Sequence, residues 1–249
     1  MNETTFDWHS AYLSDVKWPI LASICYLGTV VFLRANIRDN RFAKIIQPIQ
    51  IGHNFILSIG SAVLAVYTAI LVVKRWSQDG STFLLCENTE NITHELYLAS
   101  YIYYLSKYYE LLDTVLQLLK GRDPPNLFFG VYHHTLVLFM SWLWLEYVQS
   151  TQFIGLIWNC FVHTIMYYYY FLLGFTGSPP VWKRMVTTVQ IVQFVFSLFV
   201  LLGYIAMRIS GYECSGEYAL IFNAIFNITL LYQFIGIKTR AREDSHKKK

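Results

Sequence analysis

Long apolar stretches separated by short polar segments run the whole length of this chain of 249 residues. Most approach or exceed the roughly 20 residues that a helix needs to cross the hydrocarbon core of a bilayer. Inside hydrocarbon every backbone amide must bond within the protein, and the pattern lacks the strict alternation of a membrane barrel, so helices are predicted. We expect about seven transmembrane helices, at residues 19–34, 51–73, 96–119, 128–148, 153–175, 181–207 and 218–236.

The composition agrees with this pattern, since 55% of the residues are hydrophobic and only 14% are charged. With a mean hydropathy of +0.38, the chain lies outside the usage of ordinary soluble proteins. We therefore predict an all-α membrane protein in which residues 1–249 form a single polytopic domain. The first apolar stretch lacks a basic segment before it and a small-residue cleavage site after it, so we interpret it as a retained span.

Basic side chains gather in alternate loops, which predicts the orientation of the bundle. By the positive-inside bias these loops face the cytosol. This places residues 1–17 in a lumen and the basic tail, residues 238–249, in the cytosol. The net charge of +3 reflects the tail and indicates no nucleic-acid partner. The basic residues that set this orientation are Arg34, Arg38, Arg41, Lys44, Lys120, Arg122, Lys183 and Arg184.

Cysteines and glycosylation sequons also report on the luminal face. Cys86 and Cys214 lie in loops assigned to that face, where an oxidising compartment would allow a disulfide between them. The alternative is two unrelated free thiols. Asn2 and Asn91 each begin a sequon on the same face, so we expect a glycoprotein.

Ionisable side chains within the third stretch indicate a working site, because charge is costly in lipid and usually faces a polar interior. Lys107, Glu110 and Thr114 have the spacing i, i+3, i+7 and share one helix face, with Asp113 at its edge. The lysine and the carboxylates can neutralise one another. The alternative is an ion pair, or a lysine reaching toward the interface, that only holds the bundle together.

Histidines occur in the next two stretches. His133 and His134 are adjacent, hence about 100° apart around a helix, so one can face a tunnel while the other bonds a neighbouring helix. Asn159, His163 and Tyr167 form a stripe at i, i+4, i+8. A lone buried histidine is usually a satisfied core residue, but three on successive spans beside two carboxylates favour function.

Two other chemistries compete with this reading. Cys160 shares the face of His163, but without a cationic activator nearby in sequence it is better explained as a small buried hydrophobe than as a nucleophile. A membrane di-iron desaturase or hydroxylase would need many more histidines in repeated boxes, so we expect no metal and no cofactor. The remaining histidines are assigned outside the cluster: His9, His53, His94 and His246.

Non-enzymatic seven-helix proteins are the remaining alternatives. A retinal protein would need a lysine inside the last span, whereas Lys238 is only at its cytosolic end. No internal repeat or broken helix pair suggests a transporter. The span count allows a receptor, which would leave the buried histidines and carboxylates unexplained.

Four ordered motifs on successive spans carry a family resemblance. The chain resembles the ELO family of very-long-chain fatty acid elongases, the membrane 3-oxoacyl-CoA synthases, over nearly its full length. Its motifs are similar to the family's KxxExxDT, HxxHH, HxxMYxYY and TxxQxxQ boxes. They are Lys107-x-x-Glu110-x-x-Asp113-Thr114, Tyr132-His133-His134, His163-x-x-Met166-Tyr167-x-Tyr169-Tyr170 and Thr187-x-x-Gln190-x-x-Gln193.

One position departs from the family pattern. The first histidine of the HxxHH box would fall at residue 130, where this chain has Gly130. The departure concerns that first imidazole and not His133 or His134. A catalytically weak elongase paralogue is the alternative that it raises.

The resemblance implies an acyltransferase that condenses a long-chain acyl-CoA with malonyl-CoA. The products are CO2, CoA and a 3-oxoacyl-CoA two carbons longer. It further implies a multi-pass protein of the endoplasmic reticulum membrane with a luminal disulfide between Cys86 and Cys214. The candidate partners are the ketoacyl-CoA reductase, the dehydratase and the enoyl-CoA reductase of the elongation cycle, together with a second copy of this chain.

The resemblance also suggests roles for single residues. His133 and His163 would be the reacting pair, one accepting the acyl group or acting as base and the other moving protons or stabilising the oxyanion. The expected orienting groups are His134, Glu110 and Asp113. The expected substrate-binding residues are Lys107, Asn159, Tyr167, Gln190 and Gln193, with Lys183, Arg184, Arg240 and Arg242 for the phosphates of CoA.

Overall fold

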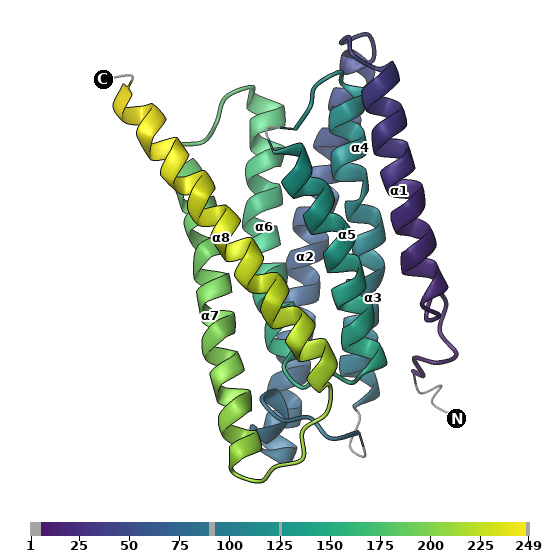
Figure 1. Cartoon of the computed structure of the whole chain (residues 1–249), viewed down its shortest axis with the longest axis vertical. Coiled ribbons are helices and arrows are strands. Elements are labelled where there is room, and N and C mark those ends of the chain that lie inside the picture. The colour runs from purple at the N-terminus through teal and green to yellow at the C-terminus, as the bar shows by residue number, and fades with distance from the viewer. Residues whose placement is uncertain (1–5, 90–92, 125, 248–249) are drawn as a thin grey trace.

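The protein is an all-helical bundle, seen in a computed structural model that describes residues 6–89, 93–124 and 126–247, with side chains described as far as residue 239 (Figure 1). All regular elements of these ranges are helical. They are α1 (Lys17–Asn36), α2 (Ala43–Asp79), the short 3-10 helix η1 (Thr82–Leu84), α3 (His94–Glu110), α4 (Leu112–Leu119), α5 (Leu127–Glu146), α6 (Gln152–Thr176), α7 (Lys183–Ile209) and α8 (Glu217–Lys247).

The prediction of an all-α membrane protein is confirmed, and each of the seven apolar stretches is helical. Within the described residues five helices are long and apolar enough to cross a membrane: α1, α2, α5, α7 and residues Glu217–Thr239 of α8. The other helices, α3, α4 and α6, hold Lys107, Glu110, Asp113 and His163. Polar groups thus concentrate where the bundle is most enclosed, and α6 runs through its middle (Figure 1).

The third apolar stretch, expected as one helix, is divided at Leu111. The backbone N–H of Leu111 donates to the carbonyl of Tyr108, three residues back, whereas a regular α-helix has bonds to the carbonyl four residues back. Glu110 ends α3 and Asp113 lies in the first turn of α4. The two carboxylates of the motif therefore belong to different helices and contact different partners.

Burial is inverted relative to a soluble protein. Large apolar side chains such as Val31 and Val63 are more than 60% exposed on the outside, whereas Lys107 and Glu110 are each 1% exposed. A lipid solvent accounts for this, because hydrocarbon accepts apolar surface and excludes charge.

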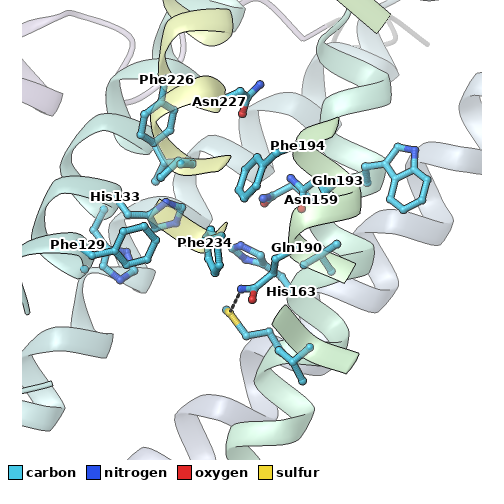
Figure 2. Close-up of a pocket in the computed structure, with 18 of the residues that line it drawn as sticks. Phe129, His133, Asn159, His163, Gln190, Gln193, Phe194, Phe226, Asn227 and Phe234 are labelled. Atoms are coloured by element: carbon cyan, nitrogen blue, oxygen red, sulfur yellow. Dashed lines mark hydrogen bonds between the residues drawn. The ribbon is translucent and has the colours of Figure 1, made fainter. Parts of the chain in front are cut away.

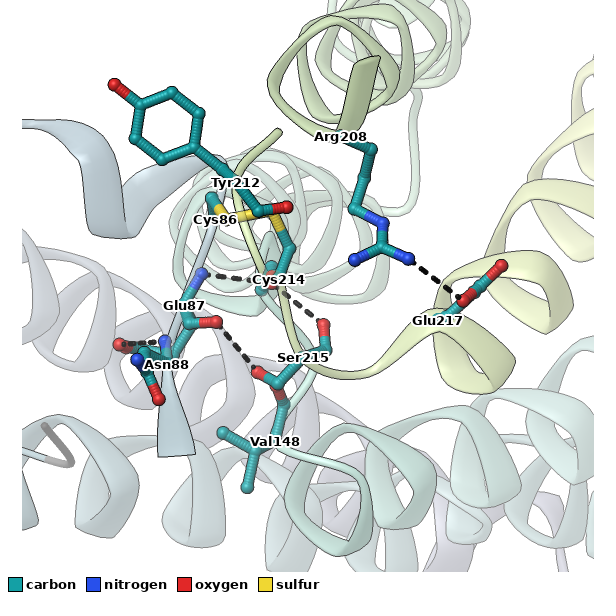
Figure 3. The surroundings of a disulfide bond; sticks show 10 residues. Cys86, Glu87, Asn88, Val148, Arg208, Tyr212, Cys214, Ser215 and Glu217 are labelled. Carbon is teal, nitrogen blue, oxygen red and sulfur yellow. Dashed lines mark hydrogen bonds and ion pairs between the residues drawn. A yellow bond between two sulfur atoms is a disulfide. The ribbon is translucent and has the colours of Figure 1, made fainter. Parts of the chain in front are cut away.

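The disulfide between Cys86 and Cys214 is present, as predicted, with the two Cα atoms 4.7 Å apart (Figure 3). It joins the segment after η1 to the loop between α7 and α8. In that loop Ser215 donates its backbone N–H to the carbonyl of Glu87 and its hydroxyl to the carbonyl of Val148. These bonds attach the hairpin of α7 and α8 to the rest of the bundle at this end.

A buried ion pair lies beside the disulfide. Both terminal nitrogens of Arg75 donate to the carboxylate of Glu87, at 2.6 and 2.8 Å. Arg75 also stacks over Phe83 at 4.2 Å. Cys25 and Cys160 are free thiols, the second of them buried. The predicted sequons at Asn2 and Asn91 lie outside the described residues.

Candidate active site

A cavity of about 780 Å³ lies inside the bundle, lined by residues of α2 to α8. At one end it is bordered by Arg122 and Lys183, and at the other by Thr151 and Leu220. These ends correspond to the predicted cytosolic and luminal faces. A cavity of this size falls in the range of small-molecule and cofactor sites.

His133 of α5 and His163 of α6 extend into this cavity from different helices (Figure 2). His133 stacks between aromatic rings, with ring centroids 5.9 Å from Phe129 and 6.1 Å from Phe226. This packing fixes the imidazole plane and excludes water from one side. Phe194 and Phe234 add apolar wall around the two histidines.

His163 is linked to the Lys107–Glu110 pair. Its Nδ1 lies 3.6 Å from Glu110 Oε1, which also accepts a 2.7 Å bond from the ammonium of Lys107. Lys107 lies 3.4 Å from the side-chain oxygen of Asn159 and 4.0 Å from the ring of Tyr103. Tyr103 donates to the same oxygen of Asn159 at 2.9 Å. His163 and Asn159 are therefore connected through one network of polar contacts that includes Lys107, Glu110 and Tyr103.

Asp113 forms a separate cluster. Its Oδ2 accepts a 2.7 Å bond from the hydroxyl of Tyr167 and lies 3.7 Å from Nε2 of His134. Its Oδ1 is 2.7 Å from Nε2 of His53 on α2. The assignment of His53 outside the histidine cluster was therefore wrong. The expected neutralisation of Lys107 involves Glu110, and Asp113 instead contacts two histidines and a tyrosine.

The cavity also receives the polar side chains predicted on α7. Gln190 and Gln193 both line it, and Gln190 lies 3.4 Å from the sulfur of Met166. Asn223 and Asn227 of α8 line it as well, and neither was predicted as a site residue from the sequence. Their spacing of four residues in the last span was the signal that could have found them, since unpaired amides are costly in lipid.

The cationic residues predicted to bind CoA do not all line the cavity. Both Lys183, in the first turn of α7, and the neighbouring Arg184 are exposed, but only Lys183 lines the cavity. The side chains of Arg240 and Arg242 lie outside the described residues. Arg122, which was not predicted to bind CoA, lines the same end as Lys183.

Lys120 follows α4 at this end and contacts Gln47 and Gln50 of α2. Partial burial, and then the nearby charge of Arg122, lower the pKa of Lys120. Gln50 also lines the cavity, so Lys120 supports its wall.

The backbone at Gly130, where the chain departs from the family pattern, has room for a side chain to begin. Gly130 lines the cavity, and a Cβ at this position would meet its nearest atom, Oγ1 of Thr114, at 3.7 Å, an ordinary contact. Tyr26 of α1 donates to the same hydroxyl at 2.8 Å. The position beside Thr114 therefore accommodates at least a Cβ.

The chemistry available here is that of imidazoles in a largely apolar chamber, backed by carboxylates. Such imidazoles can accept and release protons or act as nucleophiles, and a carboxylate on the opposite ring nitrogen sets the tautomer. Among the described residues, no group of three or more His, Cys, Asp or Glu side chains is arranged to hold a metal ion.

The sequence of the chain is similar to those of known proteins. The chain matches the ELO: GNS1/SUR4 family over residues 11–247. It is 30% identical to fatty acid elongase A of Dictyostelium discoideum over 240 residues, covering 95% of this chain and 85% of the relative. It is 28% identical to very long chain fatty acid elongase 2 of Rattus norvegicus over 215 residues, covering 83% and 75%. The chain therefore belongs to the ELO (GNS1/SUR4) family.

Proposed function

We propose that this protein is a fatty acid elongase that condenses a long-chain acyl-CoA with malonyl-CoA. The products are a 3-oxoacyl-CoA two carbons longer, CO2 and CoA. The observation that carries the proposal is the cavity within an ELO-family helix bundle into which His133 and His163 both project. An apolar chamber suits a long acyl chain, and imidazoles suit acyl transfer.

The reaction divides into two bond changes. Either the acyl group first passes from the CoA thioester to one imidazole, releasing CoA thiol, or the thioester is attacked directly. In both cases malonyl-CoA loses CO2 from its carboxylate, and the resulting α-carbon attacks the acyl carbonyl carbon. The bond that breaks there is the acyl–imidazole bond in the first route, which frees the histidine, and the acyl–sulfur bond in the second, which releases CoA. His133 and His163 supply the acyl acceptor or base and the proton donor, and water is excluded while the enolate exists.

The contacts of Asn159 and Tyr167 favour Asn159 as the donor to the thioester oxygen. The side-chain oxygen of Asn159 already accepts from Tyr103, so its NH2 group is the part left to donate. The hydroxyl of Tyr167 already donates to Asp113. A donor aimed at the developing oxyanion stabilises the transition state more than the ground state.

The end of the cavity bordered by Lys183 and Arg122 is where the CoA phosphates would bind, with Arg184, Arg240 and Arg242 nearby in sequence. Arginine and lysine are the usual partners of phosphate oxygens. The acyl chain would then extend past the histidines toward Leu220. In this arrangement the head group stays at the cytosolic face and the reactive carbonyl lies within the bundle.

This orientation agrees with the position of the disulfide at the opposite end, because disulfides persist in oxidising compartments. We infer a protein of the endoplasmic reticulum membrane with its amino terminus in the lumen and its carboxyl terminus in the cytosol. A 3-oxoacyl-CoA product needs reduction, dehydration and a second reduction before the next cycle. A ketoacyl-CoA reductase, a dehydratase and an enoyl-CoA reductase are the corresponding partners, and self-association is a further proposal.

The test is to incubate the purified protein with malonyl-CoA labelled with ¹³C at C2 and a panel of acyl-CoAs that differ in length and unsaturation. We expect a 3-oxoacyl-CoA that carries one label and two extra carbons, detected by mass spectrometry. The His133→Ala and His163→Ala variants are the matched controls, provided that they unfold at the same temperature as the wild-type protein. If no acyl-CoA in the panel yields such a product, the proposal is wrong.

A further inference from the structure

A histidine outside the four sequence motifs contacts the site and calls for an explanation. His53 lies on α2, its side chain is only 3% exposed, and it does not line the cavity. Its Nε2 is 2.7 Å from Oδ1 of Asp113, 60 residues away in sequence. His53 therefore cannot touch a substrate in the cavity, and any effect on the reaction must pass through Asp113.

Asp113 is held by a different helix on each side. Tyr167 of α6 donates to its Oδ2, and His134 of α5 approaches the same oxygen at 3.7 Å. An ionised carboxylate only accepts hydrogen bonds, so the ring nitrogen of His53 nearest to it must carry the proton. Without His53, Oδ1 loses this close partner and the carboxylate gains freedom to rotate away from His134.

The position of His134 is the reason this matters. His134 lines the cavity on the same helix turn as His133, and the centroids of the two rings lie 5.3 Å apart. A carboxylate that holds one imidazole determines which of its nitrogens carries the proton and how the ring is turned. Asp113 Oδ2, 3.7 Å from Nε2 of His134, is therefore placed to orient that imidazole, and His53 holds the other oxygen of Asp113.

We propose that His53 is a positioning residue of the condensation reaction, which holds the carboxylate of Asp113 between Tyr167 and His134. The inference rests on the proposed function for its kinetic test and on the structure alone for its spectroscopic test. It predicts that His53 donates through Nε2 and that its effect requires Asp113.

The kinetic test uses variants that differ in reach. In His53→Gln the amide nitrogen is as many bonds from Cβ as Nε2 is in histidine, so it can still donate to Asp113, whereas in His53→Asn it is one bond short. We expect His53→Ala and His53→Asn to lower kcat about 10- to 100-fold, the usual effect of losing a group that orients a site residue. KM for acyl-CoA should stay unchanged and His53→Gln should recover most of the rate.

Ser58→Ala is the matched packing control. Ser58 lies on the same helix and donates to the carbonyl of Thr164 on α6, away from Asp113. It should leave kcat unchanged while removing an equally buried polar contact of α2. If Ser58→Ala slows the enzyme as much as His53→Ala, or if His53→Gln is no better than His53→Asn, His53 is only a packing residue.

A double-variant cycle tests the route of the effect. If His53 acts through Asp113, then His53→Ala should cause no further loss of kcat in an Asp113→Asn background. Equal losses in both backgrounds would overturn the inference. Wild-type protein that makes no elongated product would refute the proposed function instead.

The spectroscopic test does not depend on activity. In protein labelled with ¹⁵N on histidine, the signal of His53 is identified by its disappearance in His53→Gln. We expect a protonated Nε2 and a bare Nδ1, and a change of this signal in Asp113→Asn. A proton on Nδ1 alone would overturn the inference whatever the protein catalyses.

Discussion

Separating the two members of the buried Lys107–Glu110 pair is the sharpest test of whether it holds the bundle together or serves the reaction. The side chains are 1% and 2% exposed, and their charged atoms are 2.7 Å apart. Removing one partner leaves the other charge buried. Breaking a buried pair in this way typically destabilises a protein by about 3–5 kcal/mol.

The remaining contacts decide where in this range each variant falls. In Glu110→Gln, Lys107 keeps a 3.4 Å contact to Asn159, the ring of Tyr103 at 4.0 Å and the amide oxygen of the new side chain. We expect the lower end, about 3 kcal/mol, against a total stability of roughly 5–15 kcal/mol for a typical protein. In Lys107→Met, Glu110 keeps His163 at 3.6 Å but loses its ammonium partner, so a comparable loss is expected.

The double variant Lys107→Met, Glu110→Gln distinguishes structure from chemistry. With both charges gone the desolvation cost disappears as well, so the double variant should be markedly more stable than the sum of the single losses allows. Its condensation rate should nevertheless stay low, because His163 has lost the carboxylate beside Nδ1. Thermal unfolding in detergent, read by fluorescence, and the labelled malonyl-CoA assay measure the two quantities.

Two outcomes would contradict this reasoning. Full activity in the double variant would mean that the pair only holds helices together and that Glu110 has no orienting role. Stability losses that simply add up would mean that the two charges do not compensate one another in the folded protein.

Three further predictions concern the histidines, the glycine and the disulfide. Replacing His133 or His163 with alanine should lower the rate of condensation by about 10²- to 10⁴-fold while folding stays intact. The rate is measured from the mass of the product, and full activity in both variants would mean that neither histidine belongs to the site. If an acyl-imidazole forms, acyl-CoA alone should release CoA, detected with a thiol reagent. Gly130→His should retain or raise activity, because a Cβ at this position makes only an ordinary contact and the position lines the cavity that would receive the ring. Activity seen only in this variant would mark the natural chain as a weak enzyme. Alkylation without reductant should leave Cys86 and Cys214 unmodified. Reductant should lower the melting temperature, because it removes a cross-link that stabilises the folded protein by at most about 5 kcal/mol on the chain-entropy model; an unchanged melting temperature on reduction would contradict this.

Much of the architecture was predictable because hydropathy acts locally. A bilayer demands about 20 apolar residues per span, and every predicted stretch is helical in the structure. The disulfide followed from the shared sidedness of Cys86 and Cys214. Placing Asn159, His163 and Tyr167 on one helix face needed only the helical repeat, and all three line the cavity.

The amino-acid pattern was thus enough to predict the helical membrane class, the family resemblance and the set of polar groups that lipid would not tolerate. Which of these groups contact one another became visible only in the folded bundle. Leu111 divides the motif so that Glu110 contacts His163 while Asp113 contacts His53, and this last contact joins residues 60 positions apart. Such a contact depends on how α2, α4 and α6 are rotated and paired. Helix rotation is set by packing between helices, and the hydropathy pattern of a single span does not contain this information.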